Sequence, residues 1–402
     1  MKPIYMDHSA TTPLSEGALN AMLPYMREQF GNPSAVYSYG QTAKNAVEKS
    51  RDRVAKAIGA LRTEIFFTSG GTESDNWVIR SVARLKGRGH IITSSIEHNA
   101  VLRTLAQLEE DGYEVTYLAP DRLGQIAPEQ LERAIRPDTI LVSIMLANNV
   151  VGTVLNIREL AAVARRHRVL FHTDAVQAVG HIPVQVRSLG VDFLSISAHK
   201  FCGPKGVGAV FCRMPNKLPP LLTGGGQEKE RRSGTENVPG IVGMAQALEE
   251  AVAALDCTIP RLKALRDRLI EGVTAIQGIA LTGDPVRRLP GFASFTVSGV
   301  GHSVLLVNAL NECGYCVSSG SACSASSKEA SHVLLSLGYE PSEASSSLRI
   351  TLGAENTEAE VDGVIEAIRR CVARLRTESV TRAPRLEGRV ADYGAAGERA
   401  ND

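Results

Sequence analysis

The chain has 402 residues, of which 44% are hydrophobic and 22% charged, a composition typical of a folded protein with an ample core. Its 44 Lys and Arg residues against 43 Asp and Glu residues give a net charge of +1, which argues against nucleic acid or an anionic membrane as the main partner. The sequence has no apolar run of membrane-spanning length and no apolar signal segment near its start, so we expect a cytoplasmic protein without direct contacts to membrane or nucleic acid.

The first half of the chain predicts alternating strands and helices. A short strand and turn at 4–13 precede helices at 16–29 and 42–58, and from residue 64 β-rich runs alternate with helical stretches such as 156–167. Apolar, β-branched strands separated by helices indicate a mainly parallel sheet that is covered on both faces. The predicted fold class is therefore α/β, with seven strands at 64–68, 90–93, 114–118, 139–146, 169–172, 192–196 and 208–212.

The pattern changes after about residue 255. Charged helices such as 260–272 precede a strand-rich part and a helix at 358–376, which together predict a smaller α+β domain. The last residues are polar and almost without large apolar side chains, so we expect a disordered tail. The predicted division is an N-terminal segment 1–15 packing with the small domain, a large domain 16–255, a small C-terminal domain 256–376 and a tail 377–402.

The stretch DFLSISAHKFCGPKGVG, residues 192–208, holds the most informative lysine of the chain. Lys200 follows a predicted strand, stands beside His199 and precedes a cluster of Gly and Pro that ends regular structure. A lysine amine is the side chain that forms a Schiff base with an aldehyde cofactor. Taken alone, the pattern is equally compatible with a surface lysine in a turn.

Other polar residues follow other predicted strands. Gly70-Gly71-Thr72 would offer backbone N–H groups and a hydroxyl to a phosphate, although Thr72 could also cap a helix with Asp75 at its third position. Asp174 would pair with a pyridinium nitrogen, or it could cap a helix. His98 would stack on a ring or transfer a proton. Because ligands bind beyond the carboxyl ends of parallel strands, these residues together predict a pyridoxal 5′-phosphate site.

The second half of the chain supplies two further candidates. Cys323 lies in the small-residue stretch SSGSACSASS, which suits an exposed loop that presents a nucleophilic thiol, although a serine-rich linker with an incidental cysteine is the alternative. Arg349, in a β-rich run, could hold a substrate carboxylate or pair with a structural acid. Among the seven cysteines, Cys313 and Cys316 form a C-x-x-C pair without a second pair or histidine cluster, so we expect no metal site.

From about residue 4 to residue 376 the chain resembles the NifS/IscS-like cysteine desulfurases, in the fold-type I, class V aminotransferase group of pyridoxal-phosphate enzymes. The resemblance rests on the motifs DHSATTP, FGNPSA, FTSGGTESDN, IEHNAV, HTDAVQAVG, SAHKFCGPKG, GGGQEKERRSGTENVP and SSGSACSASS. It implies that Lys200 binds the cofactor aldehyde, Asp174 pairs with the ring nitrogen and His98 stacks on the ring as an acid/base group.

The resemblance implies roles for further residues. Gln177 would bond the ring hydroxyl, and Asn149 and Arg349 would hold the substrate carboxylate, with Asn149 also beside the cofactor. Cys323 would be the nucleophile that forms a persulfide. The phosphate would be bound by Gly71, Thr72, Ser197 and His199, with Thr235 of a second subunit.

The implied activity is conversion of L-cysteine to L-alanine by a homodimer, with sulfur passed through Cys323 to an acceptor protein for Fe–S cluster assembly or for thiolation of tRNA or cofactors. Two departures from the family pattern, Val150 after Asn-Asn and Ser-Lys-Glu-Ala-Ser before His332, concern substrate or acceptor specificity. A selenocysteine lyase or another class V aminotransferase-type enzyme is the alternative activity. A non-catalytic scaffold would be expected to lack Lys200 or Cys323, and both are present.

Overall fold

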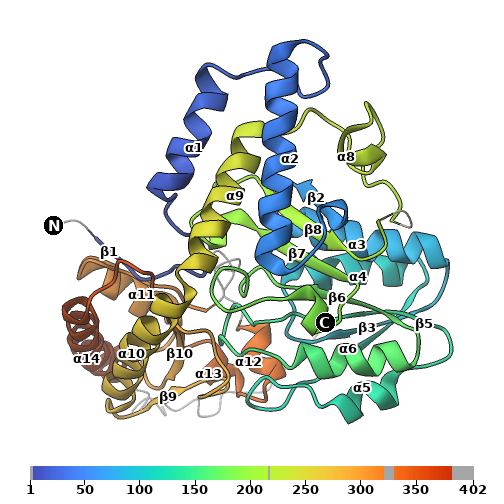
Figure 1. The fold of residues 1–402 in the computed structure, drawn as a ribbon. Coiled ribbons are helices and arrows are strands. Elements are labelled where there is room, and N and C mark those ends of the chain that lie inside the picture. The colour runs from blue at the N-terminus through green and yellow to red at the C-terminus, as the bar shows by residue number, and fades with distance from the viewer. Residues whose placement is uncertain (1–2, 216–217, 321–329, 383–402) are drawn as a thin grey trace, which may run out of the picture.

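The computed structural model describes residues 3–215, 218–320 and 330–382 (Figure 1). A central sheet of seven strands has the order β2-β8-β7-β6-β5-β3-β4, in which β8 runs antiparallel to both neighbours and all other pairs are parallel. The predicted seven-stranded, mainly parallel α/β fold is therefore confirmed. Its strands are β2 (Ile65–Thr68), β3 (His90–Ser94), β4 (Glu114–Leu118), β5 (Thr139–Ser143), β6 (Leu170–Asp174), β7 (Phe193–Ser197) and β8 (Gly208–Cys212).

Helices cover both faces of this sheet, because its strands are apolar on both sides. Phe66 and Ile91 pack with one hydrophobic cluster, which includes Trp77, whereas the adjacent residues Phe67 and Ile92 belong to a cluster on the other side. The first cluster is formed with α3 (Gly71–Lys86) and α4 (Asn99–Glu110). The second involves α1 (Glu16–Arg27), α2 (Ser38–Ile58), α5 (Pro128–Ala134), α6 (Ile157–Arg166), α7 (Val186–Leu189) and α9 (Val238–Ala253).

A separate core surrounds a three-stranded antiparallel sheet of order β12-β10-β9. Near it, β1 (Ile4–Tyr5) pairs in parallel with β11 (Tyr315–Cys316), which joins the start of the chain to its second half. The two cores and a bend of 71° between α9 and α10 support a boundary near residue 255, and the exact domain limits stay a prediction. The elements of this part are α10 (Leu255–Thr274), β9 (Ile279–Leu281), β10 (Phe292–Val297), α11 (Ser303–Glu312), α12 (His332–Ser336), α13 (Pro341–Ala344), β12 (Ser347–Thr351) and α14 (Glu358–Arg382).

Some predicted boundaries were wrong. Helix α14 continues to Arg382, so residues 377–382 are helical where a tail was expected, and 383–402 lie outside the described residues. Strand β5 ends at Ser143, although Ile144 N–H still donates to His172 O at 3.1 Å. Such differences of a few residues are typical of element ends.

No single helix in the described ranges is both long and apolar enough to cross a membrane. The bent pair α9–α10 meets the criteria of length and composition only when its two helices are counted together.

Candidate active site

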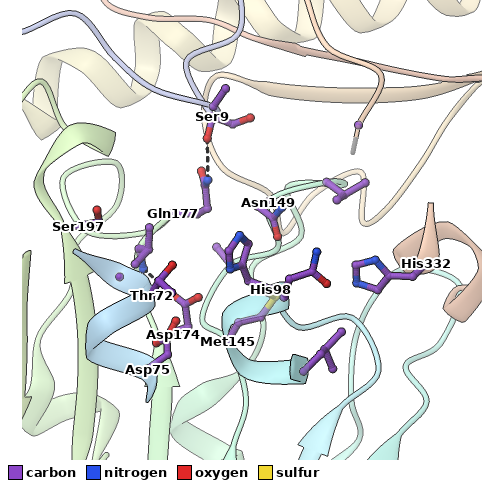
Figure 2. A pocket seen from close by; sticks show the side chains of 18 of the residues that line it. Ser9, Thr72, Asp75, His98, Met145, Asn149, Asp174, Gln177, Ser197 and His332 are labelled. Atoms are coloured by element: carbon purple, nitrogen blue, oxygen red, sulfur yellow. Dashed lines mark hydrogen bonds between the residues drawn. The ribbon is translucent and has the colours of Figure 1, made fainter. Parts of the chain in front are cut away.

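A cavity of about 1020 Å³ lies at the carboxyl ends of the central strands (Figure 2). Its wall also includes the start of the chain, through Ser9 and Ala10, and the second core, through Gly320 and Arg349. The parallel topology places the ends of β6 and β7 and the starts of α3 and α4 at one edge, where a ligand is expected. The cavity brings together most of the predicted site residues, namely Gly71, Thr72, His98, Asn149, Asp174, Gln177, Ser197, His199, Lys200 and Arg349.

The Gly-Gly-Thr turn forms a close backbone approach between β2 and α3. Gly70 has φ +151°, a conformation that favours glycine, and a Cβ on Gly71 would lie 2.7 Å from Val176 Cγ2. Helix α3 begins at Gly71 with Gly70 as its N-cap, so the alternative with Thr72 as cap and Asp75 at the third position was wrong. The first N–H groups of α3 are therefore open to an anion. A smaller hollow of about 440 Å³ beside this turn is lined by Thr72, Ser197, His199 and the cation Lys205, which suits a phosphate.

Lys200 lies at the end of η2 (Ala198–Lys200), the short turn that follows β7. Its Nζ donates hydrogen bonds to Ser9 O at 2.5 Å and Ala10 O at 2.9 Å. The backbone carbonyl of Lys200 accepts a hydrogen bond from His181 Nε2 at 2.8 Å, which holds the turn in place. The amine of Lys200 is therefore held at the cavity wall by the N-terminal segment.

Asp174 ends β6 with 6% of its surface exposed, and its Oδ1 accepts the Val176 N–H at 2.9 Å. A turn follows it rather than a helix, so the helix-cap alternative was wrong. Burial raises the pKa of Asp174, while His98, the Val176 N–H and Lys200 lower it. A buried carboxylate that lines a cavity is stabilised by a cationic partner, and a protonated ring nitrogen is one. This feature and the glycine cradle fit pyridoxal phosphate.

His98 is the N-cap of α4, and its Nδ1 accepts the Ala100 N–H at 3.1 Å. The acceptor role of Nδ1 places the ring proton on Nε2 in the neutral form. Burial lowers the pKa of His98, Asp174 opposes this and Lys200 adds to it. A neutral imidazole at the cavity wall can therefore exchange a proton or stack on a ring.

Two other predicted groups also bond the N-terminal segment. Gln177 Nε2 donates to Ser9 O at 2.9 Å (Figure 2), and the His199 ring contacts Thr11 Oγ1 at 3.1 Å. Burial, with the nearby cations Lys200 and Lys205, lowers the pKa of His199 to about 4. His199 is therefore neutral and would bind a phosphate through hydrogen bonds rather than charge.

Arg349 and Asn149 also line the cavity and contact each other. Arg349, on β12, is 2% exposed, and its guanidinium donates to Asn149 O at 2.8 Å and forms an ion pair with Asp7 at 2.8 Å. Within the described residues, Arg349 Nε and Asn149 Oδ1 are buried without a hydrogen-bond partner. Buried polar atoms without partners are costly, so a polar ligand at this place would be stabilised.

Two predicted residues are not in this group. Thr235 lines a separate hollow of about 70 Å³ beside Ser69 and Gly206, at the outer side of the glycine turn. Cys323 falls in 321–329, outside the described residues. Gly320, three positions before it, lines the cavity.

Sequence reasoning missed two residues that line this cavity, Asp75 and His332, and the adjacent buried residue Glu97. Asp75 and Glu97 are each 1% exposed, and Glu97 Oε1 accepts bonds from Ser94 Oγ at 2.5 Å and Met145 N at 2.9 Å. Burial raises the pKa of Asp75, and Asp174 adds to this; burial raises the pKa of Glu97 to about 8. His332 lines the cavity (Figure 2), and its Nε2 contacts Glu97 O at 3.1 Å. The sequence around Glu97, Ser-Ser-Ile-Glu-His-Asn, is mostly polar and gives no local signal for its burial.

Comparison with known proteins finds relatives that match over most of the chain. The sequence model of the aminotransferase class-V family matches residues 4–364. Cysteine desulfurase IscS of Methanosarcina thermophila is 51% identical over 382 residues, 94% of both chains. The protein of the same name from Dictyoglomus turgidum is 48% identical over 383 residues, 94% of this chain and 96% of its own. A solved structure described as a NifS-like protein has a TM-score of 0.87 at 38% identity and covers 92% of this chain and 100% of its own.

Proposed function

The chain belongs to the aminotransferase class-V family, and we infer from its relatives and its cavity that it is a pyridoxal-phosphate-dependent cysteine desulfurase. Its substrate is L-cysteine, its carbon product is L-alanine, and its sulfur passes to an acceptor. The observation that carries the proposal is the convergence of Lys200, Asp174, His98 and the Gly70–Gly71 turn on one cavity, in a chain similar to cysteine desulfurases over 94% of its length.

The cavity residues divide into three functional sets. Lys200 would hold the cofactor aldehyde, Asp174 would keep the ring nitrogen protonated, and Gln177 would bond the ring hydroxyl. Bound pyridoxal phosphate supplies an electron-accepting ring for the electron pair released at the substrate Cα. The phosphate would be held by Gly71, Thr72, Ser197 and His199 beside Lys205.

The remaining residues orient the substrate and move protons. Arg349 Nε and Asn149 would bind the substrate carboxylate, since both present buried polar atoms without partners within the described chain. Lys200 would remove the Cα proton and His98 Nε2 would exchange protons with the reacting groups. The Cys323 thiolate would take the substrate sulfur: an S–S bond forms as the substrate C–S bond breaks, and the carbon skeleton leaves as alanine after protonation.

The test is release of alanine and sulfide from L-cysteine with pyridoxal phosphate and a thiol reductant. We expect equal amounts of both from the native chain and neither from Cys323→Ala, which should keep the cofactor colour. Cys257→Ala is the control, because Cys257 is an exposed cysteine that lies outside the cavity lining. Full activity of Cys323→Ala would contradict the assigned nucleophile, and a higher kcat/KM for selenocysteine would favour a selenocysteine lyase.

We also propose a homodimer in which Thr235 completes the partner's phosphate site. Phe30, Val36, Tyr37 and Tyr39, around the start of α2, are 71%, 89%, 62% and 52% exposed, and a cluster of exposed large apolar side chains is typical of an interaction surface. Thr235 lies outside the cavity of its own chain, which leaves it available to a second copy. Light scattering of the native chain would measure the mass, and a monomer would contradict the proposal.

A further inference from the structure

Two cysteine sulfurs meet in the second core, away from the cavity. Cys313 Sγ lies 3.8 Å from Cys371 Sγ, although the residues are 58 positions apart in sequence. Cys313 is the C-cap of α11 and is exposed, whereas Cys371 lies on α14 with 4% exposure. Since a disulfide has an S–S bond of about 2.05 Å, the two sulfurs need only a small side-chain movement to bond.

The sequence spacing suggests that Cys313 and Cys316 form a pair, but in the structure the two residues have different neighbours. Cys316 lies on β11, opposite Tyr5 of β1, and interacts electrostatically with the Tyr5 hydroxyl. Cys313 precedes that strand and contacts α14 instead. The spatial partner of Cys313 is therefore Cys371 and not Cys316.

The two thiols differ in exposure, so we expect them to differ in reactivity. Burial and the contact with Cys313 raise the pKa of Cys371 to about 11, which keeps Cys371 protonated. Arg370 and Arg374 lie near Cys371, and Arg374 is 3.6 Å from Glu312, the neighbour of Cys313 in sequence. Cys313 is the exposed member of the pair, so it is the thiol that a dissolved oxidant reaches first.

We propose that Cys313 and Cys371 form a redox-active dithiol that hydroperoxides oxidise to an intramolecular disulfide. The Cys313 thiolate attacks a peroxide oxygen, the O–O bond breaks, and Cys313 becomes a sulfenic acid as hydroxide leaves. The Cys371 sulfur then attacks the sulfenic sulfur, the S–O bond breaks, and the Cys371 proton leaves with the hydroxyl group as water. Each pair of thiols loses two electrons to one hydrogen peroxide, and a thiol reductant restores both thiols.

The bond would cross-link the end of α11 to α14 and close a loop of sequence that contains Cys323 and Arg349. A cross-link between distant positions restricts the unfolded chain more than the folded one. Oxidation should therefore raise the midpoint of thermal unfolding, and reduction should reverse the shift.

The experiment treats the full-length holoenzyme, freed of substrate and reductant, with hydrogen peroxide and maps its peptides by mass spectrometry without reduction. We expect a peptide joining Cys313 to Cys371 that is lighter by two hydrogens and is absent after reduction. Cys257→Ser, with its exposed thiol replaced, should still form this link, whereas Cys313→Ser should not. The exposed position of Cys313 lets that variant fold even where replacement of buried Cys371 would not.

Three results would overturn the proposal. They are a link from Cys313 to Cys316, a link between two chains, and oxidation of Cys313 to its sulfinic acid with Cys371 still reduced. Because neither cysteine lines the cavity, these results would leave the desulfurase assignment untouched.

Discussion

Arg349 and Asp7 form an ion pair of 2.8 Å across 342 positions of sequence, at the wall of the cavity. The same N-terminal segment bonds Lys200 and Gln177 through Ser9 O and Ala10 O. With the contact between Thr11 and His199, one short segment therefore contacts four of the residues assigned to the site. Asp7 orients the guanidinium of Arg349, so that Nε, which lacks a partner within the described chain, remains available to a substrate carboxylate.

Arg349→Lys tests this role in substrate binding. Lysine keeps the charge next to Asp7 but lacks the planar fork and the Nε donor. We expect the KM for L-cysteine to rise about tenfold, equivalent to about 1.4 kcal/mol, with a smaller change in kcat. Steady-state kinetics measure this, and Arg268→Lys, an exposed arginine paired with Asp362, is the control. An unchanged KM would assign Arg349 to structure alone.

Asp174→Asn tests the carboxylate assigned to the ring nitrogen. An amide has nearly the same shape but cannot offset a cationic ring, so the ring proton is lost more easily. We expect kcat to fall at least about a hundredfold, while pyridoxal phosphate still binds covalently through Lys200 and absorbs at a changed wavelength. Absorbance spectra and alanine release give the two readouts. The exposed Asp138→Asn should change neither, and full activity of Asp174→Asn would refute the role.

The sequence predicted much of the site because local pattern and parallel topology act together. Lys200, Asp174 and His98 each follow a strand of one sheet, and parallel strands bring their carboxyl ends to one edge. The contacts of Asp7, Ser9 and Ala10 could not be predicted from the residues, since they join positions up to 342 apart.

The sequence also could not predict which polar side chains are buried. Asp75 had the spacing of a helix-cap residue, but α3 begins at Gly71, which turns Asp75 toward the sheet and leaves it 1% exposed. Glu97 adjoins His98 in a polar-looking turn, and only the packing around β3 and β5 encloses it. Local periodicity reports a face of a helix or strand and does not report such enclosure.

Glu97→Gln tests the buried carboxyl through the pH dependence of stability. The folded-state pKa of Glu97 is raised from 4.5 to about 8, so between these values the folded protein holds a proton that the unfolded chain has lost. The stabilisation that this bound proton provides is complete below pH 4.5 and is lost as the pH rises to about 8. Over this range the free energy of unfolding falls by up to about 1.4 kcal/mol per pH unit. The amide oxygen of the variant can still accept the bonds from Ser94 and Met145, so the variant should show a flatter decline of stability with pH.

Urea unfolding of the apoprotein between pH 5 and pH 8 measures the difference between the two curves, in about one-unit steps. Subtracting the native curve from that of the variant removes the contributions of groups that Glu97 does not influence, such as His172, whose pKa is lowered by burial alone. Glu110→Gln, an exposed change on α4, should run parallel to the native curve. A parallel curve for Glu97→Gln would show that Glu97 ionises normally in the folded protein.

Heterodimers test whether Thr235 acts across a subunit interface. In a dimer of one Lys200→Ala chain and one Thr235→Ala chain, one site would contain both Lys200 and the partner's intact Thr235. We expect such a dimer, co-expressed with two affinity tags, to have about half of the native activity, since one site of two is complete. The Lys200→Ala homodimer should be inactive, and the Thr235→Ala homodimer should be weakly active.

The reciprocal pairing decides between action on the partner's site and action within one chain. A native chain paired with a Lys200→Ala/Thr235→Ala chain has Lys200 at one site only, and that site would face the altered Thr235 of the partner. Action across the interface therefore predicts a weakly active dimer, whereas action within one chain predicts about half of the native activity. Because Thr235 lies beside Ser69 and Gly206, outside the cavity of its own chain, we expect the first result.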